Sequence, residues 1–372
     1  MLIGVPKEIK THEYRIGMTP PGVRELVRHG HQVVVEHDAG HMIGIDDAHY
    51  MAAGAEVADS AADVFGRAEM IVKVKEPQAD EIAMLGADQT IFTYLHLAPD
   101  PAQTDALMAS GCTAIAYETV SAADGSLPLL APMSEVAGRM AVQAGATGLE
   151  IERGGRGVLL GGVPGVMPGK VVILGGGVVG TNAAFIATGM GAKVTVIDLS
   201  QPRMAALDFQ FQSLITTLYS TADAIESEVL AADLVVGAVL VPGAASPKLV
   251  SRDIVRQMKR GSVLVDVAID QGGCFETSHA TTHADPFYVA DGVVHYCVSN
   301  MPGAVARTST FALNNVTLPF VLTLADAGVC DAMRGDAHLG AGLNVYRGET
   351  IHPAVAEAQG KSFTPVDEAL AA

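Results

Sequence analysis

The sequence predicts an α/β protein with two Rossmann-like, doubly wound domains, built on mostly parallel sheets and separated by an active-site cleft. Short apolar runs alternate with longer amphipathic segments, once before about residue 128 and again after about residue 165. The runs are nearly continuous in Val, Ile and Leu, as in parallel strands that helices cover on both faces. A glycine-rich turn near residue 175 joins one run to a helix. Repeated strand–helix units of this kind indicate doubly wound sheets.

Ten apolar runs are predicted to form strands. Those before residue 128 are Leu2–Val5, Gln32–Glu36, Met70–Lys75, Thr90–Leu97 and Thr113–Glu118. Those after residue 165 are Lys170–Leu174, Lys193–Ile197, Leu234–Leu240, Val263–Ile269 and His295–Val298.

Helices are predicted where a start signal precedes an amphipathic segment. Thr19-Pro20-Pro21 and Asp100-Pro101 each place a capping side chain before proline in the first turn. A third helix is expected to begin at Ser134-Glu135 and to run to about Leu149.

The pattern changes in the C-terminal part of the chain. Ser309–Ala327 reads as a long helix interrupted near Pro319, and Pro353–Gln359 reads as another helix. A C-terminal segment that packs on the first domain is consistent with this change. The Gly- and Pro-rich stretch Gly154–Gly169 is expected to be a connecting loop.

Composition excludes several classes of protein. Of 372 residues, 49% are hydrophobic and 17% charged, which allows sizeable cores and excludes a disordered or fibrous chain. The net charge of −18, without a basic run, argues against nucleic acid or an anionic membrane as a partner. The four cysteines are far apart, so we expect neither a disulfide framework nor a metal site, and we expect a reducing cytosol.

One uncharged stretch, Val171 to Ala192, is long enough to cross a bilayer. Its six glycines, Asn182 and two threonines divide it better into a strand, a glycine turn and a helix. We therefore expect no membrane span. The opening MLIGVPKEIK also lacks a charged region followed by an apolar one, so no signal peptide is expected.

The strongest local signal is the run KVVILGGGVVGT, residues 170–181. It is a strand followed by G-x-G-x-x-G and a helix-compatible stretch. Gly175 would permit the tight turn, Gly177 the approach of a pyrophosphate, and Gly180 the close packing of helix on strand. The helix N-terminus would offer N–H groups to phosphates. This unit predicts a dinucleotide site.

An acidic residue at the end of the next run selects the dinucleotide. Asp198 lies 23 residues after Gly175, where a carboxylate bonds ribose hydroxyls and repels a 2′-phosphate, so NAD is favoured over NADP. Val178 and Val179, between the glycines, are expected to line the same cofactor. The alternative is a plain strand–helix turn with an incidental aspartate.

Four apolar runs end in a polar residue: Lys75, His96, Asp270 and Asn300. Parallel sheets bind ligands outside the carboxyl ends of their strands, so these side chains are expected to converge on one crevice beside the nicotinamide. Each has a structural alternative. His96 could be a satisfied strand-edge histidine, and Lys75 could extend into solvent. Asp270 could cap a turn, and Asn300 could be a turn residue.

Two further polar residues have contrasting interpretations. Arg15 lies in the polar loop after the first run and could capture a substrate carboxylate through two hydrogen bonds. Taken alone, an exposed surface arginine is the alternative. Asp266, on the same strand as Asp270, is expected to be structural.

Six stretches together resemble a known family: GVPKEIKTHEYRIGMTP, MIVKVKEP, FTYLHLAPD, ILGGGVVGTNAA, DVAIDQGGCFETS and NMPGAVARTST. In this order, and over essentially the whole chain, they resemble bacterial L-alanine dehydrogenase. The proton-translocating transhydrogenase α subunit shares the fold and the N-terminal pattern. The chain shows no stretch like that subunit's membrane-spanning extension, and DQGGCFETS and HYCVSNMPGA look like the dehydrogenase.

The resemblance implies reversible oxidative deamination of L-alanine by NAD, giving pyruvate and ammonium, in a cytoplasmic homohexamer. By motif position, Arg15 and Lys75 would bind the substrate, His96 and Asp270 would be catalytic, and Asn300 would position the substrate or the nicotinamide. Residues 1–128 with 306–372 would form the substrate domain, and residues 129–305 the NAD-binding domain. The other residues expected at the NAD site are Ser134, Val178, Asp198, Arg203, Ser220, Val239, Leu240, Val267, Ala268, Ile269, His279, Val298, Ser299 and Met301.

Two positions depart from the family pattern. His279 and Ala280 stand where some members have Arg followed by Pro, so a basic contact to the cofactor is expected to be weaker or pH-dependent. Ala306 replaces a proline often found before Arg307, which is expected to loosen a loop.

Our hypothesis for the reaction passes hydride from the alanine Cα to nicotinamide C4. The resulting iminium adds water and collapses to pyruvate and ammonia. His96 would act as general acid/base, because imidazole titrates near neutrality. Asp270 would orient and deprotonate the water or hold the ammonium. Lys75 would stabilise charge on the developing carbonyl oxygen.

Three other functions fit parts of the pattern. An NAD(H)-binding subunit could pass hydride to a membrane partner and would show no deaminase activity. A non-catalytic nucleotide-sensing module would keep the glycine turn but would not need the Lys, His and Asp set. A dehydrogenase for another amino acid, such as saccharopine, would differ only in the substrate pocket.

Overall fold

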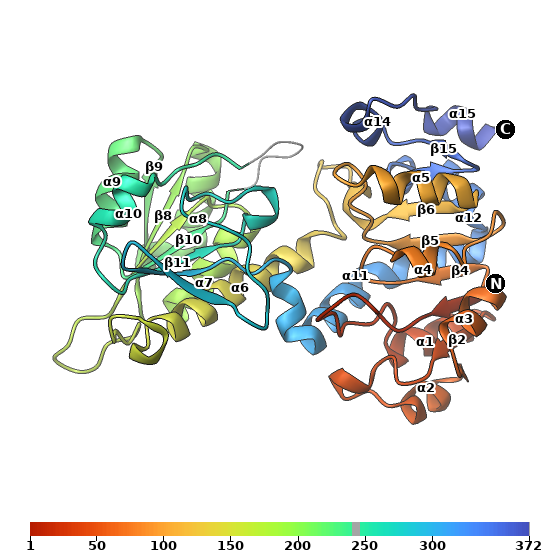
Figure 1. Ribbon diagram of the computed structural model, residues 1–372, viewed down its shortest axis with the longest axis horizontal. Helices are drawn as coiled ribbons and strands as arrows, with labels where there is room; N and C mark the ends of the chain where they lie inside the picture. Colours follow the sequence, from red (N-terminus) through yellow and green to blue (C-terminus); the bar gives the residue numbers. More distant parts are fainter. Residues whose placement is uncertain (240–245, 372) are drawn as a thin grey trace. The chain divides into compact units, whose positions relative to one another are not determined.

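The computed structural model describes residues 1–239 and 246–371, which form two compact units (Figure 1). The first unit contains Met1–Met133 and Val305–Ala372, and the second contains Ser134–Ala304. Each unit is a mostly parallel sheet with helices, as the alternation of apolar runs predicts.

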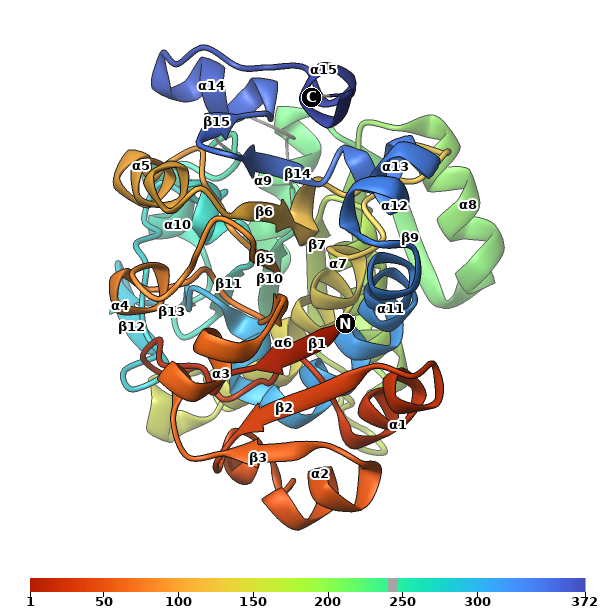
Figure 2. The ribbon, with the colours of Figure 1, turned by 90° about the vertical axis from the view of Figure 1, so that its right-hand side faces the viewer.

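The first unit has an eight-stranded sheet, in the order β15-β14-β6-β5-β4-β1-β2-β3 (Figure 2). The strands are β1 (Leu2–Val5), β2 (Gln32–Glu36), β3 (Glu56–Ala58), β4 (Met70–Val72), β5 (Thr90–Thr93), β6 (Thr113–Ala116), β14 (Leu343–Tyr346) and β15 (Glu349–Thr350). Strands β1 to β6 are parallel, whereas β14 pairs antiparallel with β6 and β15. The strand order changes direction between β1 and β4, which is where such sheets bind ligands.

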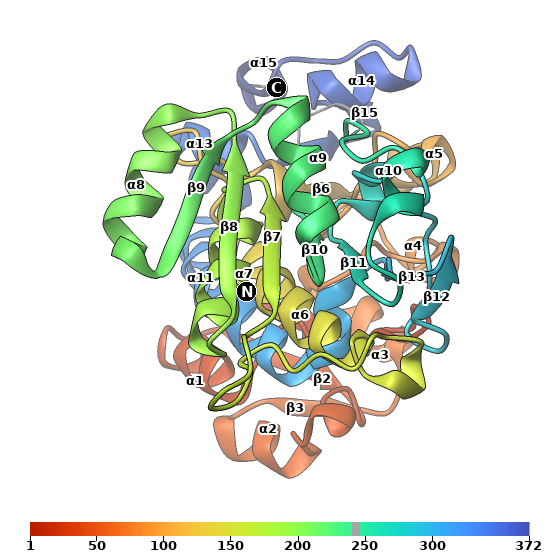
Figure 3. The same ribbon diagram turned by 90° about the vertical axis from the view of Figure 1, so that its left-hand side faces the viewer.

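The second unit repeats this plan with seven strands, in the order β12-β13-β11-β10-β7-β8-β9 (Figure 3). They are β7 (Lys170–Leu174), β8 (Lys193–Asp198), β9 (Ile215–Tyr219), β10 (Leu234–Gly237), β11 (Val263–Asp266), β12 (Phe287–Ala290) and β13 (Val293–Tyr296). Only β12 among them is antiparallel to its neighbour. The order changes direction between β7 and β10.

Helices follow most of the strands. In the first unit they are α1 (Pro20–Arg28), α2 (Asp47–Ala53), α3 (Ala61–Arg67), α4 (Ala79–Ile82), α5 (Pro101–Ser110), α11 (Ala306–Ala327), α12 (Val329–Gly335), α13 (Ala337–Gly340), α14 (Pro353–Gln359) and α15 (Val366–Ala371). In the second unit they are α7 (Val178–Gly189), α8 (Gln201–Phe211), α9 (Ala222–Ala231) and α10 (Arg252–Gln257). Helix α6 (Ala131–Gly148) begins at the end of the first segment and continues into the second unit.

The predicted start signals form the caps of two helices. The Thr19 side chain accepts a hydrogen bond from the Gly22 nitrogen at the start of α1, and Asp100 accepts one from Gln103 at the start of α5. Proline occupies the first turn of both, where its missing N–H costs no helical hydrogen bond. Gly111 ends α5 in the left-handed conformation, with φ of 73°.

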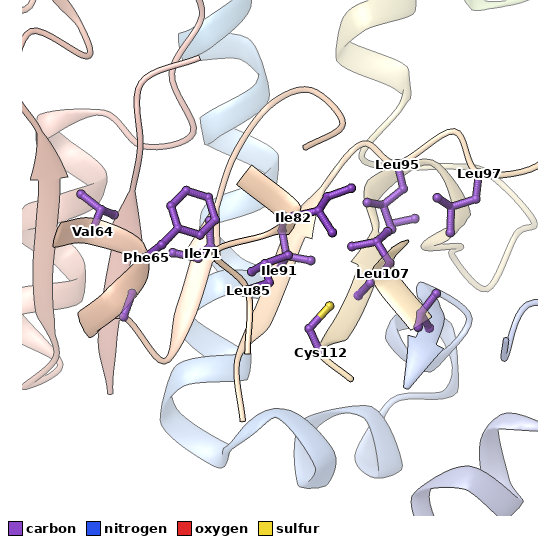
Figure 4. Close-up of a cluster of buried hydrophobic side chains, with 14 of the residues drawn as sticks. Val64, Phe65, Ile71, Ile82, Leu85, Ile91, Leu95, Leu97, Leu107 and Cys112 are labelled. Carbon is purple, nitrogen blue, oxygen red and sulfur yellow. The ribbon is translucent and has the colours of Figure 1, made fainter. Parts of the chain in front are cut away.

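A layer of aliphatic side chains packs one face of the first sheet against helices (Figure 4). Ile71 of β4 and Ile91 of β5 belong to one cluster with Phe65 of α3, Ile82 of α4 and Leu107 of α5. The strand residues are fully buried, which explains why the runs are continuous in apolar residues instead of alternating. Burial of this kind supplies the main driving force for folding.

Several predicted bounds require correction. Helix α11 passes through Pro319 without interruption, because its neighbours Leu313, Val321 and Leu324 are buried and hold the helix against the unit. Helix α6 begins at Ala131, three residues before the predicted start. The runs ending at Lys75, Leu97, Glu118 and Ile269 are strands only in their first part, and their last residues form loops or short 3₁₀ turns. The strand that begins at Leu234 ends at Gly237, and Leu240 lies outside the described residues.

Within residues 1–239 and 246–371, no single helix is both long and apolar enough to cross a membrane. Met301–Ala327 and Val329–Gly335 reach that length and composition only when taken together, across a bend of 114°. All four cysteines are free thiols.

Candidate active site

The glycine turn of the second unit has the geometry that the sequence predicts. Gly175 adopts φ of 98°, a conformation that side chains disfavour. A Cβ on Gly180 would lie 1.8 Å from the Gly175 carbonyl oxygen, so only glycine lets α7 approach the strand end. A Cβ on Gly177 would meet no atom within 4 Å. The space beside Gly177 is open in the described structure, as a bound pyrophosphate requires.

Helix α7 begins at this turn and presents its N-terminus there. Gly177 is the N-cap residue, and no described side chain caps the helix. The first N–H groups of a helix have no partner within the helix and carry a partial positive charge. The turn therefore offers donors to a phosphate group, and its residues fit a dinucleotide.

Asp198 lies at the end of β8, beside the glycine turn. Its Oδ2 accepts a hydrogen bond from the Gly176 nitrogen at 2.6 Å, and its Oδ1 accepts one from the Ser200 nitrogen at 2.7 Å. Arg203 donates from its side chain to the carbonyl oxygen of Gly176 and to the hydroxyl of Thr181. The predicted cofactor residues Asp198 and Arg203 thus hold the same turn from two sides.

A second polar loop follows β11. Asp270 is exposed in the 3₁₀ turn η5 (Ile269–Gln271). Asp266, at the end of the strand, is fully buried and accepts hydrogen bonds from the Cys274 nitrogen (2.9 Å) and the Ser278 hydroxyl (2.6 Å). Burial raises the pKa of Asp266, and these hydrogen bonds lower it only in part. Asp266 thus has the expected structural role, since it ties down the loop that carries Asp270.

Asn300 and His279 lie after the last strands of the second unit. Asn300 has φ of 62°, and its carbonyl oxygen lies 3.1 Å from His283 Nε2. The exposed His279 ring stacks on Tyr288, with centroids 3.8 Å apart, and Tyr288 stacks on the buried His295 at 4.8 Å. His279 therefore stands at the outer end of a row of three rings.

The remaining predicted cofactor residues lie in the second unit. Ser220 follows β9 and donates from its backbone to the Asp198 carbonyl oxygen at 3.0 Å. Val239 follows β10, and Ser134 lies in α6. Leu240 lies outside the described residues. Three groups flank β11 and β13 at their carboxyl ends: Val267, Ala268 and Ile269; Val298 and Ser299; and Met301.

In the first unit, four side chains follow the carboxyl ends of four adjacent strands. Glu8 follows β1, Lys75 follows β4, His96 follows β5 and Glu118 follows β6. Across the sheet the order is therefore carboxylate, ammonium, imidazole, carboxylate. Lys75 and His96 each lie three residues beyond the end of their strand, and these two strands are neighbours in the sheet. Two of the predicted site residues thus follow neighbouring strands of the first sheet.

A buried charge cluster supports the segment that carries Lys75. Glu8 accepts hydrogen bonds from the Val74 nitrogen at 2.7 Å and the Lys75 nitrogen at 3.2 Å. The ammonium of the fully buried Lys73 lies 3.0 Å from Glu8 and 2.6 Å from Glu81. Burial raises the pKa of Glu8, although Lys73 opposes this. Burial lowers the pKa of Lys73, but the two carboxylates more than offset that effect and the pKa is raised.

His96 occupies an uncommon backbone conformation. Its φ is 51°, in the left-handed region that residues other than glycine uncommonly adopt. The imidazole is 45% exposed and lies parallel to the Tyr94 ring, with centroids 5.8 Å apart. An accessible imidazole beyond a buried strand is suited to proton exchange with a ligand.

Arg15 is buried, which contradicts the alternative of an exposed surface arginine. Its side chain is 2% exposed, and it donates from Nε and from an Nη to the two oxygens of Glu13, at 2.7 and 2.5 Å. Burial lowers the pKa of Arg15, but the Glu13 carboxylate more than offsets that effect and the pKa is raised. One edge of the guanidinium is thus engaged by Glu13, and Arg15 is held as a permanent cation.

The sequence analysis missed the carboxylates of the first unit: Glu8, Glu13, Glu81 and Glu118. A signal existed for Glu8 and Glu118, because each lies two or three residues beyond a strand end, as Lys75 and His96 do. Arg15, Lys75 and His96 belong to the first unit, and Asp270 and Asn300 to the second. Their convergence on one nicotinamide stays a prediction.

One further group among the described residues has suitable donor atoms for a metal ion. His37, Asp38 and Asp47 place one ligand atom each within 4.8 Å of the others, at the first unit's surface. The His37 imidazole is already paired with both carboxylates, at 3.2 and 2.5 Å.

Comparison with known families covers both units. The family model described as alanine dehydrogenase/PNT, N-terminal domain, matches residues 4–137, and the model for the C-terminal domain matches residues 141–353. The chain belongs to the alanine dehydrogenase/PNT family. The resemblance drawn from the six sequence stretches is thereby confirmed, as is the fold class of two α/β units with mostly parallel sheets.

Individual members of the alanine dehydrogenase/PNT family match over nearly the full chain. The alanine dehydrogenase of Halomonas elongata is 61% identical, over 98% of this chain and 98% of its own. A solved structure of L-alanine dehydrogenase superposes with a TM-score of 0.94 at 55% identity, covering 97% of this chain and 99% of that one. A transhydrogenase structure from Sinorhizobium meliloti gives a TM-score of 0.82 at 26% identity, covering 95% and 100%.

Proposed function

We propose that this chain catalyses the reversible oxidative deamination of L-alanine, in which L-alanine, NAD⁺ and water give pyruvate, ammonium, NADH and a proton. The observation that carries this function is the position of Lys75 and His96, each of which follows one of two neighbouring strands of the first sheet. An ammonium and an imidazole beyond neighbouring strands suit a substrate that has a carboxylate and loses a proton. Full-length identity of 61% to an alanine dehydrogenase supports the choice of alanine.

NAD is the proposed cofactor, and the second unit would hold it. The N-terminus of α7 and the open space beside Gly177 fit the pyrophosphate, and Asp198 fits the ribose. When bound, NAD supplies the acceptor for the hydride of the substrate Cα. The carboxylate of Asp198 favours NAD over NADP, because it repels a 2′-phosphate.

The first unit would bind the substrate and transfer its protons. Arg15, fixed by Glu13, and Lys75 would bind the carboxylate and the developing carbonyl oxygen. His96 would take up and return protons, since imidazole is the side chain whose ordinary pKa lies near neutrality. Asp270 of the second unit would orient the water that adds to the iminium, and Asn300 would position the substrate or the nicotinamide.

The test follows NADH absorbance with the purified chain, L-alanine and NAD⁺. We expect oxidation of L-alanine with a higher kcat/KM than that of L-serine, glycine or saccharopine, and slower reaction with NADP⁺. A higher kcat/KM with saccharopine than with L-alanine would mean that saccharopine, and not alanine, is the substrate. Absence of oxidation with all four amino acids would overturn the dehydrogenase.

A second candidate is an NAD(H)-binding subunit of a transhydrogenase. The TM-score of 0.82 to the Sinorhizobium meliloti transhydrogenase favours it, whereas the identity of only 26% argues against it. Such a subunit would bind NADH but leave L-alanine unchanged. Equilibrium NADH binding, measured by fluorescence beside the turnover assay, separates the two functions.

We also propose that the enzyme is a cytoplasmic homohexamer. Exposed apolar side chains at Ile151, Leu159, Val166 and Met167 support association, because large exposed apolar side chains close together in a chain favour contact surfaces. Light scattering behind size-exclusion chromatography measures the mass, and six times 38.4 kDa is the expected result. A monomer mass would overturn the assembly.

A further inference from the structure

Glu118, one of the carboxylates of the first unit, contacts the backbone of His96. It follows β6 in the 3₁₀ turn η2 (Tyr117–Thr119), on the strand next to the one that carries His96. Its Oε1 accepts a hydrogen bond from the His96 nitrogen at 2.6 Å, and both of its oxygens lie 3.2 Å from the Leu95 nitrogen. The Glu118 carboxylate therefore holds two successive N–H groups of the segment beyond β5.

We propose that Glu118 is a positioning residue for His96, which fixes the backbone of His96 in the left-handed conformation and sets the orientation of its imidazole. The proposal rests on the function proposed above, because it deepens the role of His96 in that reaction. Glu118 itself need not touch the substrate.

The backbone argument starts from the φ of 51° at His96. A side chain disfavours this conformation, so surrounding contacts must hold it. The two N–H groups that point to Glu118 are those of Leu95 and His96, and both depend on this local turn. Hydrogen bonds to a charged acceptor are stronger than bonds between neutral groups. The Glu118 carboxylate therefore stabilises the left-handed conformation of His96. A neutral or shorter side chain at position 118 would stabilise it less.

The imidazole is restrained by the same carboxylate and by Tyr94. His96 Nδ1 lies 3.8 Å from Glu118 Oε1, and the ring lies nearly parallel to Tyr94, at an interplanar angle of 4°. Tyr94 is itself fixed by a hydrogen bond of 2.6 Å from its hydroxyl to the Leu129 carbonyl oxygen. A negative charge beside Nδ1 favours the proton on that nitrogen. Nε2 is then the nitrogen that exchanges a proton with the substrate.

The groups around Glu118 are consistent with a role in positioning His96. Its side chain is 16% exposed. Burial lowers the pKa of the neighbouring His352, and the charge of Glu118 opposes that effect only in part. His352 is therefore a neutral neighbour at pH 7. The hydrogen bonds of Glu118 with the Leu95 and His96 nitrogens tie it to the segment of His96.

The test replaces Glu118 with Gln, which keeps the size of the side chain and removes the charge and one acceptor. We expect kcat with L-alanine to fall about 10²-fold, as for a misplaced catalytic group, while KM for L-alanine changes much less. Dissociation constants for NADH and the thermal midpoint should stay close to those of the wild type. Glu118→Asp, which keeps the charge but shortens the reach, should retain more activity than Glu118→Gln.

The matched control is Glu69→Gln. Glu69 also accepts a backbone hydrogen bond, from Leu2 at 2.7 Å, but at the amino ends of strands β1 and β4. The Glu69→Gln variant should therefore have the kcat of the wild type. A His96→Ala background supplies the second control, because a residue that acts through His96 has no further effect once the imidazole is gone. An equal loss from Glu118→Gln in both backgrounds overturns the proposal, and so does unchanged kcat in the single variant.

A crystal structure of Glu118→Gln decides the positioning role without the reaction. We expect residue 96 to leave the left-handed region or its imidazole to move away from Tyr94. If neither changes, the positioning role is wrong. If the wild type fails to oxidise L-alanine, the proposed function falls, and the crystal structure still decides the role of Glu118. Should Glu118→Gln fail to fold, Glu118→Asp is measured in its place, and its shorter reach should still lower kcat and displace residue 96, whereas wild-type kcat and geometry in that variant would overturn the proposal.

Discussion

The backbone nitrogen of Gly176 donates a hydrogen bond to Oδ2 of Asp198 across 2.6 Å, and this bond joins the glycine turn after β7 to the end of the neighbouring strand β8. One carboxylate therefore has two consequences. It fixes the turn that would receive the pyrophosphate, and it places a negative charge beside that turn. Changes at Asp198 can separate the two.

Asp198→Asn should narrow the preference for NAD over NADP. The amide keeps an oxygen acceptor for a backbone N–H but removes the charge that repels a 2′-phosphate. We expect the ratio of kcat/KM values for NAD⁺ and NADP⁺ to fall about 10-fold, which corresponds to about 1.4 kcal/mol. Steady-state rates with both cofactors measure it, with Asp223→Asn in the first turn of α9 as control. An unchanged ratio would mean that Asp198 does not face the ribose.

Gly180→Ala and Gly177→Ala should fail in different ways. At Gly180 a Cβ would lie 1.8 Å from a backbone oxygen, so α7 must shift. The free energy of unfolding should therefore fall by about 1–3 kcal/mol. At Gly177 the Cβ meets open space and φ is −65°, so stability should be preserved. That Cβ would instead occupy the space expected for the pyrophosphate. Urea unfolding and NADH titration measure the two effects, and normal NADH binding by Gly177→Ala would contradict the placement of the pyrophosphate beside Gly177.

His96→Ala should lower kcat by about 10²–10⁴-fold, the usual contribution of positioned acid–base catalysis, with NADH binding intact. The matched control is His41→Ala, which removes an exposed histidine paired with Asp46 in the same unit. Turnover assays and NADH titration of both variants make the comparison. Near-normal turnover would remove His96 from the mechanism.

Lys73→Met should destabilise the first unit strongly. The substitution leaves Glu8 and Glu81 buried without their cation, and removing one partner of a buried ionic cluster costs about 3–5 kcal/mol. Burial already raises the pKa of Glu8, and loss of Lys73 raises it further. A carboxyl with a raised pKa loses stability as pH rises, so the deficit should be larger at pH 8 than at pH 5. Urea unfolding at both values tests the sign.

The control for Lys73→Met is Lys10→Met. The Lys10–Glu76 pair lies nearer the surface, where ion pairs contribute about 0–1 kcal/mol. A deficit in Lys73→Met that does not depend on pH would mean that Glu8 is ionised in the folded chain at both pH values, as it is in the unfolded chain, so that its pKa is not raised into this range.

His295 should make the second unit sensitive to acid. Burial lowers its pKa to about 4, against about 6.5 for an exposed imidazole. Between these values the unfolded chain binds a proton that the folded chain does not. Stability therefore falls as pH drops from 6.5 to 4, by about 3 kcal/mol in total. Urea midpoints of wild type and His295→Asn measure the slope, which should be smaller in the variant and unchanged in His338→Asn.

Strands that the sheet buries on both faces could be predicted from the sequence, and strands that are short or largely exposed could not. Strands β1, β2 and β7 were predicted to the residue, because each is a short apolar run that a parallel sheet buries on both faces. Strand β9, Ile215–Tyr219, has only one buried residue, and β3 has three residues in all. Neither carries the apolar run that marks a covered strand, so both were missed.

The charged side chains of the candidate site could be predicted from the sequence, but the hydrogen-bond partners of those side chains could not. Lys75 and His96 stand out because a polar residue ends an apolar run. Glu118 contacts His96 through backbone N–H groups 22 residues away in the sequence. Backbone donors occur at almost every residue, so no side-chain pattern marks the partner of such a carboxylate. The same holds for Glu8 and the backbone of Lys75.

The antiparallel strand β14 completes the first sheet from the far end of the chain. During synthesis, β6 leaves the ribosome more than 200 residues before its partner, as Ala116 and Leu343 are that far apart. The second unit, which is continuous in sequence, can close first. Until release of the nascent chain, β6 is an unpaired edge exposed to neighbouring polypeptides. Stalled or truncated translation products should therefore be the aggregation-prone forms of this protein.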